Sequence, residues 1–94
     1  AELTTIQEHG MQLLVDVMRG QKKGLFLDHR HARARVRAWA KDLEVLNLFS
    51  YTGGFSVAAG LGGARRVMSI DVAPKAIELC DQNWRINGLA PQDH

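Results

Sequence analysis

The sequence has a single cysteine, Cys80, which excludes an internal disulfide and a zinc cluster built on several thiolates. Its four histidines, at positions 9, 29, 31 and 94, show no spacing typical of a metal site. No apolar run approaches the roughly 20 residues that a membrane-spanning helix needs. The first residues lack the basic and apolar segments of a secretory signal. We therefore expect a cytoplasmic protein with no metal site and no membrane partner.

The chain is short and nearly balanced in charge. Its 94 residues allow one domain at most, the net charge is +2, and 46% apolar residues are enough for a core. The charges are placed unevenly, because residues 19–41 carry +7 and the remainder −5. Such a block can bind phosphate backbones, or it can be a solvated helix face, and both interpretations stay open. Its eight basic residues are Arg19, Lys22, Lys23, Arg30, Arg33, Arg35, Arg37 and Lys41.

The first third of the chain predicts a hairpin and a helix. Two short apolar runs, 3–6 and 11–17, flank His9-Gly10, a pair compatible with a turn, so we expect a β-hairpin. From 29 to 41 the apolar residues recur at helical spacing, which predicts a basic amphipathic helix with Arg33 and Arg37 on its solvated side. Its apolar face would consist of Ala32, Val36, Trp39 and Ala40.

Strands and helices then alternate. We expect strands over 44–49 and 66–70, a helix over 54–61, and a second helix from Pro74 to about residue 87. This order predicts a parallel α/β sheet with right-handed crossovers. An average sheet has about five or six strands, and the sequence predicts two for this one. We therefore expect the N-terminal part of a Rossmann-like fold in a longer protein. We divide the chain into 1–28, the hairpin and an upstream segment, and 29–94, the basic helix and two β-α units.

The strongest chemical signal follows the strand at 44–49, which we expect to be buried. It runs into a loop with Gly53 and Gly54, and a helix starts directly after them. Glycine permits positive φ and close approach of a ligand, and ligands of open α/β sheets bind at such strand ends. Seventeen residues separate Gly53 from Asp71, which ends the next strand. The Asp71 carboxylate could therefore accept hydrogen bonds from the two hydroxyls of a ribose.

The pattern G-x-G-x-x-G is absent, which disfavours a dinucleotide and an NAD-dependent oxidoreductase. The loop has hydroxyls and an aromatic ring where a pyrophosphate would need bare glycine backbone. An adenosine ligand without a pyrophosphate suits it better. The alternative is that Gly53-Gly54 only turns the chain and that Asp71 only caps a helix.

Three segments, Gly20–Arg30, Asn47–Ser56 and Ser69–Asp71, resemble one family in order and spacing. They are similar to the class I S-adenosylmethionine-dependent methyltransferases that modify large-subunit ribosomal RNA, and the likeness runs from about Leu13 to Leu89. Related members methylate cytosine C5 or guanine N7, and this sequence has features of both types. The resemblance implies S-adenosyl-L-methionine as cofactor and RNA, ribosomal RNA in particular, as partner.

The resemblance also implies site residues. The upstream motif, Phe26–Arg30, would lie beside the methionine end of the cofactor, where Arg30 would pair its carboxylate and Asp28 its amino group. Asp28 is also a candidate N-cap for the basic helix, and both roles are compatible. Val72 would pack against the adenine, next to Asp71 as the ribose acid. The cofactor loop would comprise Asn47, Phe49, Ser50, Tyr51, Thr52, Gly53 and Gly54.

We expect no catalytic residue in this chain. The family's Asp-Pro-Pro type turn and the downstream cysteine of the cytosine type are absent, and Cys80 is expected to be a buried small side chain. The sequence therefore predicts the cofactor-binding part of an RNA methyltransferase, inactive by itself. The alternative is a basic RNA-binding module without catalysis, in which residues 19–41 make the contacts.

Overall fold

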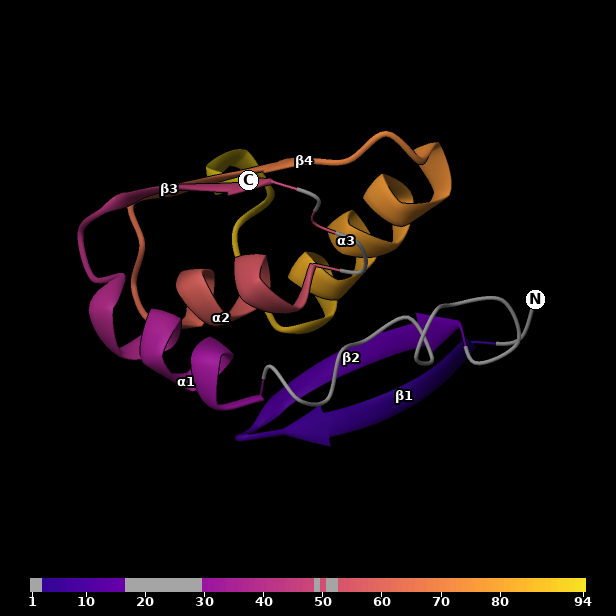
Figure 1. The fold of residues 1–94 in the computed structure, drawn as a ribbon, viewed down its shortest axis with the longest axis horizontal. Helices are drawn as coiled ribbons and strands as arrows, with labels where there is room; N and C mark the ends of the chain where they lie inside the picture. Colours follow the sequence, from indigo (N-terminus) through magenta and orange to yellow (C-terminus); the bar gives the residue numbers. More distant parts are fainter. Residues whose placement is uncertain (1–2, 17–29, 49, 51–52) are drawn as a thin grey trace.

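The structure is a computed structural model that describes residues 3–16, 30–48, 50 and 53–94. Figure 1 shows three layers: a sheet of β3 and β4, a layer of helices, and a hairpin of β1 and β2. The predicted α/β class, with a hairpin and a basic helix before two β-α units, is confirmed. The elements are β1 (Leu3–Glu8), β2 (Met11–Asp16), α1 (Arg30–Trp39), β3 (Glu44–Leu48), α2 (Gly54–Leu61), β4 (Arg66–Ile70), α3 (Pro74–Ile86) and a 3-10 turn at Pro91–Asp93.

The hairpin forms where the sequence predicts it. Strands β1 and β2 pair antiparallel, with Glu8 opposite Met11 at the turn. His9 and Gly10 have φ values of 49° and 83°, and two successive positive φ values are typical of the two-residue turns that match the twist of a hairpin. Met11 and Leu13, two positions apart on β2, are both buried, so one face of the hairpin is a core face.

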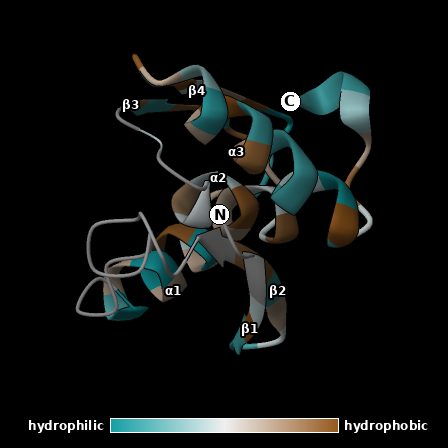
Figure 2. Cartoon of the chain, turned by 90° about the vertical axis from the view of Figure 1, so that its right-hand side faces the viewer, coloured by the Kyte–Doolittle hydropathy of each residue, from teal (hydrophilic) through white to brown (hydrophobic). Residues whose placement is uncertain are grey.

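Helix α2 lies at the centre of the molecule. It is apolar on almost every side, as expected for a buried helix, and Figure 2 shows it between the hairpin and the sheet. One buried cluster joins α2 to the hairpin, and a second joins it to the sheet and to α3. Because the two clusters share α2, this helix is held from two directions. The first cluster is Met11, Leu13, Val57 and Ala58, and the second is Ala40, Ala59, Val67 and Trp84.

Strands β3 and β4 are parallel neighbours, with Glu44 opposite Arg66 and Leu48 opposite Ile70. On the inner face, Val45 and Val67 pack with the second cluster. The outer face carries apolar side chains that are exposed within the described part of the chain: Leu46, Leu48, Met68 and Ile70. The prediction that the first of these strands is buried is therefore met only in part, because β3 is half-buried on its inner face and exposed on its outer face.

Helix α1 differs from the prediction in which side is buried. We expected Trp39 on the apolar face and Arg33 in solvent, but Trp39 is 69% exposed and Arg33 is 1% exposed. The Arg33 side chain pairs with Glu8 of β1, and Arg37 Nη1 donates to the carbonyl oxygen of His9 over 2.7 Å. The buried side of α1 is therefore set by polar partners on the hairpin, which helical spacing alone does not reveal.

Helix α3 begins at Pro74, as predicted, and is tied to the hairpin by two asparagines one turn apart. Asn83 Oδ1 accepts from the Leu14 N–H over 2.5 Å, and Asn83 Nδ2 donates to the Leu14 carbonyl over 3.1 Å. Asn87 makes the same two contacts with Gln12, over 2.9 and 2.6 Å. The two amides thus satisfy backbone groups of β2 as a neighbouring strand would.

Candidate functional site

The loop after β3 and the acid after β4 meet at one edge of the sheet. The Ser50 N–H donates to the Ile70 carbonyl over 3.0 Å, and Asp71 follows Ile70 directly. The Gly53 N–H donates to the Ser50 carbonyl over 2.8 Å, and α2 begins at Gly54. The Ser50–Ile70 bond confirms that the glycine loop and the acid lie at one edge, as expected for parallel strands that end at the same edge of a sheet. That they hold a ligand stays a prediction.

Gly53 is the position at which the loop requires glycine. Its φ of 89° lies in the left-handed region, which a side chain disfavours. A Cβ here would stand 2.5 Å from Cys80 Sγ and 3.1 Å from Cys80 Cα, so the loop rests directly on α3. A side chain at Gly53 would therefore meet α3 before any ligand. A substitution here would therefore shift the loop relative to α3 and would also alter any ligand contact.

Asp71 has a local structural role that the sequence left as an alternative. Its Oδ1 accepts from the Ala73 N–H over 2.9 Å, just before Pro74 opens α3. A carboxylate offers about four acceptor positions, so this bond is compatible with further hydrogen bonds to a ribose. The neighbouring Val72 is 89% exposed, so an apolar side chain stands in solvent beside the acid.

A chain of polar side chains lies beneath the loop. Asn47 Nδ2 donates to Ser56 Oγ over 2.8 Å, and Ser56 Oγ is 2.5 Å from Ser69 Oγ, which joins β3, α2 and β4. The buried Ser50 Oγ meets no partner at hydrogen-bond geometry within the described residues. Burial raises the pKa of the Cys80 thiol, and the Ser50 hydroxyl is one of the hydroxyls that oppose this rise. Most buried hydroxyls have a hydrogen-bond partner, so Ser50 is an exception among the described residues.

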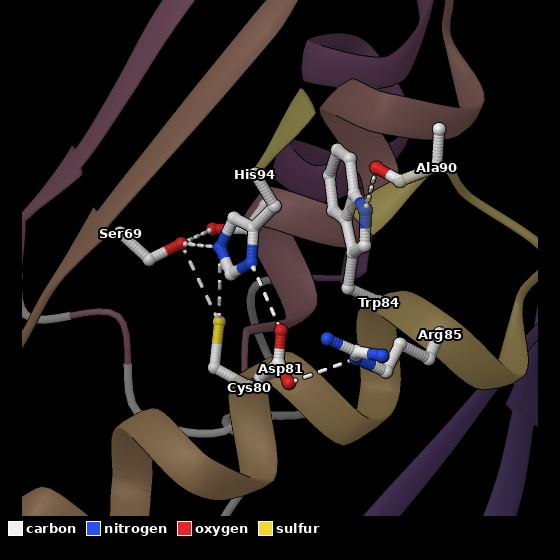
Figure 3. Close-up of polar contacts among 8 residues, drawn as sticks. Ser69, Cys80, Asp81, Trp84, Arg85, Ala90 and His94 are labelled. Atoms are coloured by element: carbon white, nitrogen blue, oxygen red, sulfur yellow. Dashed lines mark hydrogen bonds and ion pairs between the residues drawn. The ribbon is translucent and has the colours of Figure 1, made fainter. Parts of the chain in front are cut away.

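Figure 3 shows a second polar group, between α3 and the last residues of the chain. The Cys80 thiol donates to Ser69 Oγ over 3.4 Å and lies 3.7 Å from His94 Nε2. His94 Nδ1 is 3.9 Å from Asp81 Oδ1, and the imidazole stacks on Trp84 with ring centroids 4.7 Å apart. These contacts place a thiol, an imidazole and a carboxylate in the order of a nucleophilic triad.

The ionisation of this group argues against a nucleophile. Burial raises the pKa of the Cys80 thiol, and burial lowers the pKa of His94 in spite of Asp81. Both shifts favour the neutral forms, whereas a reactive cysteine needs a thiolate beside an imidazolium. Cys80 is buried, as predicted, and we assign it no catalytic role.

The remaining predicted residues are placed only in part. Asp28, Phe49, Tyr51 and Thr52 lie outside the described residues, and Arg30 is the exposed first residue of α1. Within the described ranges, no three His, Cys, Asp or Glu side chains gather closely enough to ligate a metal. None of the helices in those ranges combines the length and the apolar character needed to cross a bilayer.

The buried pair of Glu8 and Arg33 is the feature that the sequence did not reveal. Arg33 Nε and Nη2 donate to the two Glu8 carboxylate oxygens over 2.6 and 2.5 Å. The partners are 25 positions apart, so no local spacing connects them. Asn83 and Asn87 were also missed, although two asparagines four positions apart on one helix face are a detectable pattern.

Known proteins are similar to this chain over nearly its whole length. A family model described as S-adenosylmethionine-dependent methyltransferase matches residues 1–92. "Ribosomal RNA large subunit methyltransferase I" of Klebsiella pneumoniae is 51% identical over 87 residues, which are 93% of this chain and 22% of the relative.

Solved structures show the same similarity. A Streptococcus mutans protein described as a SAM-dependent methyltransferase superposes with a TM-score of 0.91 at 38% identity, over 100% of this chain and 25% of that one. TYW2 of P. horikoshii, solved in complex with MeSAdo, gives a TM-score of 0.79 at 25% identity, over 93% of this chain and 32% of that one. The chain thus spans between 22% and 32% of the length of these three proteins.

Proposed function

The chain belongs to the S-adenosylmethionine-dependent methyltransferase family, and from that premise we propose that it forms the cofactor-binding part of a methyltransferase acting on large-subunit ribosomal RNA. The observation that carries the proposal is the Ser50–Ile70 backbone bond, which brings the glycine loop and Asp71 to one sheet edge. The RNA substrate is proposed from the name of the K. pneumoniae relative. We assign no catalytic residue to this chain.

The residues at this edge fit the adenosine part of S-adenosylmethionine. The Asp71 carboxylate would accept from the ribose hydroxyls, and the exposed Val72 would cover one face of the adenine. The Gly53-Gly54 turn leads into the start of α2, where helical N–H groups point outward. When bound, the cofactor supplies an electrophilic methyl group, and the residues of this chain hold and orient it.

The rest of the proposed site surrounds this edge. We place Arg30 at the cofactor carboxylate and Asp28 at its amino group, by charge-assisted hydrogen bonds. Asn47 supports the loop through Ser56, in addition to any contact with the cofactor. The proposed loop is completed by Phe49, Ser50, Tyr51 and Thr52.

The alternative of a basic RNA-binding module has less support from the structure. Arg33 is buried against Glu8, and Arg37 donates to the hairpin turn, so these two arginines of the basic block have partners within the fold. Arg35 is exposed and could meet a phosphate. We propose a cytoplasmic location, as expected for an enzyme that acts on ribosomal RNA.

The proposal is tested by calorimetric titration of the full-length protein with S-adenosylmethionine. Asp71→Ala should lose about 1.5–3 kcal/mol of binding free energy, or roughly 10- to 150-fold in affinity, because hydrogen bonds to a charged group disappear. Glu44→Ala is the matched control, since Glu44 is an exposed acid at the opposite end of the same sheet. Equal affinity in the two variants would remove Asp71 from the site.

A further inference from the structure

Glu8 and Arg33 form a two-bond ion pair that is almost completely removed from water. The Arg33 and Glu8 side chains are 2% and 3% exposed. Burying two charges carries a desolvation penalty that apolar residues of similar volume would avoid, so such a pair is weak evidence for stability. Two parallel bonds, however, hold a planar guanidinium in one orientation. The pair is therefore better suited to fixing geometry than to adding stability.

The geometry that the pair fixes is the position of α1 beside the start of α2. Glu8 ends β1, Arg33 lies in the first turn of α1, and Arg33 Cζ is 5.8 Å from the centroid of the Phe55 ring. Phe55 is the second residue of α2, directly after the Gly53-Gly54 turn. One side chain thus connects the hairpin, α1 and the helix that starts at the loop.

Arg30 lies in the same turn of α1 as Arg33. It stands three residues before Arg33, and residues three apart are neighbours on a helix surface. Arg30 is exposed, so it presents a guanidinium to solvent about one turn away from Arg33, which contacts Phe55. Asp71 adjoins the start of the same loop through the Ser50–Ile70 bond. The proposed function assigns the ribose to Asp71 and the cofactor carboxylate to Arg30.

We propose that Glu8 and Arg33 are positioning residues whose buried pair sets the place of Arg30 relative to the loop, and that this strengthens binding of the amino-acid end of the cofactor. The inference rests on the proposed function. It assigns to a hairpin residue, Glu8, an effect on a ligand that Glu8 itself does not contact.

The test compares two ligands in calorimetric titrations of the full-length protein. S-adenosylmethionine has an amino-acid end, whereas 5′-methylthioadenosine has the same nucleoside without it. Glu8→Gln keeps the shape of the side chain but removes its charge. We expect about a tenfold loss of affinity for S-adenosylmethionine and less than about a twofold change for 5′-methylthioadenosine. A purely structural role would not separate the two ligands.

Further variants control for charge and for folding. Glu44→Gln makes the same change in the exposed pair with Arg65 and should alter neither affinity. Arg33→Lys keeps the charge but not the two-bond geometry, so its loss should be intermediate. If Glu8→Gln fails to fold because Arg33 is left unpaired, the double variant Glu8→Leu, Arg33→Met leaves no buried charge and should show the same selective loss.

The outcomes separate this inference from the proposed function. Equal losses for both ligands would show that the pair supports the whole loop, and unchanged affinities for both would show a structural role only; either result overturns the inference. A wild-type protein that binds neither ligand would instead overturn the proposed function.

Discussion

Similar residues are buried on the hairpin side of the molecule and exposed on the outer face of the sheet. Beside the hairpin, Leu13 is buried against α2, and the carboxylate of Glu8 is buried with its arginine. On the outer face of the sheet, Leu46 is exposed, and the Glu44–Arg65 pair, with an N···O distance of 3.1 Å, has side chains 63% and 69% exposed. Within the described residues, the hairpin side thus buries its ion pair and its apolar side chains, whereas the outer face of the sheet leaves both exposed.

The difference shows where the proposed cofactor loop obtains its support. Gly53 rests on Cys80 of α3, and Phe55 lies against Arg33, which is held by the hairpin. The first contact comes from α3, and the second comes from the hairpin side through Arg33. Through Arg33, the hairpin therefore supports the helix that follows the loop. It does so from a different layer than the sheet that carries the loop (Figure 1).

The largest expected contrast is between the two arginines of these pairs. Arg33→Ala should lower the free energy of unfolding by about 3–5 kcal/mol, because it leaves the Glu8 carboxylate buried without its ion-pair partner. Arg65→Ala should lower it by about 0–1 kcal/mol, because water screens the exposed pair. Urea denaturation of the full-length protein measures both values. Similar losses in the two variants would abolish the distinction between the two sides.

A smaller contrast is expected between the two asparagines that join α3 to β2. Asn83 is fully buried, so Asn83→Ala should cost about 1–3 kcal/mol by leaving backbone groups of Leu14 unsatisfied. Asn87 is half-buried and its equivalent bonds to Gln12 are exposed, so water can replace the amide and Asn87→Ala should cost about 1 kcal/mol or less. The same denaturation experiment decides the order, and a larger loss at Asn87 would contradict it.

The smallest effect is expected at Trp39, which the helical pattern placed in the core. Because its side chain is largely in solvent, Trp39→Gln should change the free energy of unfolding by no more than about 0.5 kcal/mol. Trp84→Ala, at a buried indole, is the comparison and should cost about 3–5 kcal/mol. A loss at Trp39 close to that at Trp84 would mean that Trp39 is covered in the full-length protein.

The elements that the sequence predicted correctly depend on local rules. The His9-Gly10 turn follows from two residues that tolerate positive φ, and the start of α3 follows from Pro74. The meeting of the glycine loop with Asp71 follows from the alternation of strands and helices, since consecutive parallel strands end at one edge. These features need no knowledge of distant contacts.

The features that the sequence missed depend on partners far along the chain. Helical spacing predicted an amphipathic α1, but the side that is buried is decided by Glu8, which lies 25 positions from Arg33. Helical spacing alone predicts that such an arginine is solvated, because the spacing does not reveal a buried carboxylate elsewhere in the chain. The exposure of one face of β3 was missed for a similar reason, because an apolar run predicts a strand without stating which faces are covered.

The most direct test of the proposed site is a crystal structure of the full-length protein with S-adenosylhomocysteine. We expect the ribose hydroxyls within hydrogen-bond distance of the Asp71 carboxylate, roughly 2.6–3.2 Å, and the nucleoside beside the Gly53-Gly54 turn. A ribose bound beyond the reach of Asp71, or a nucleoside at another edge of the fold, would contradict the account.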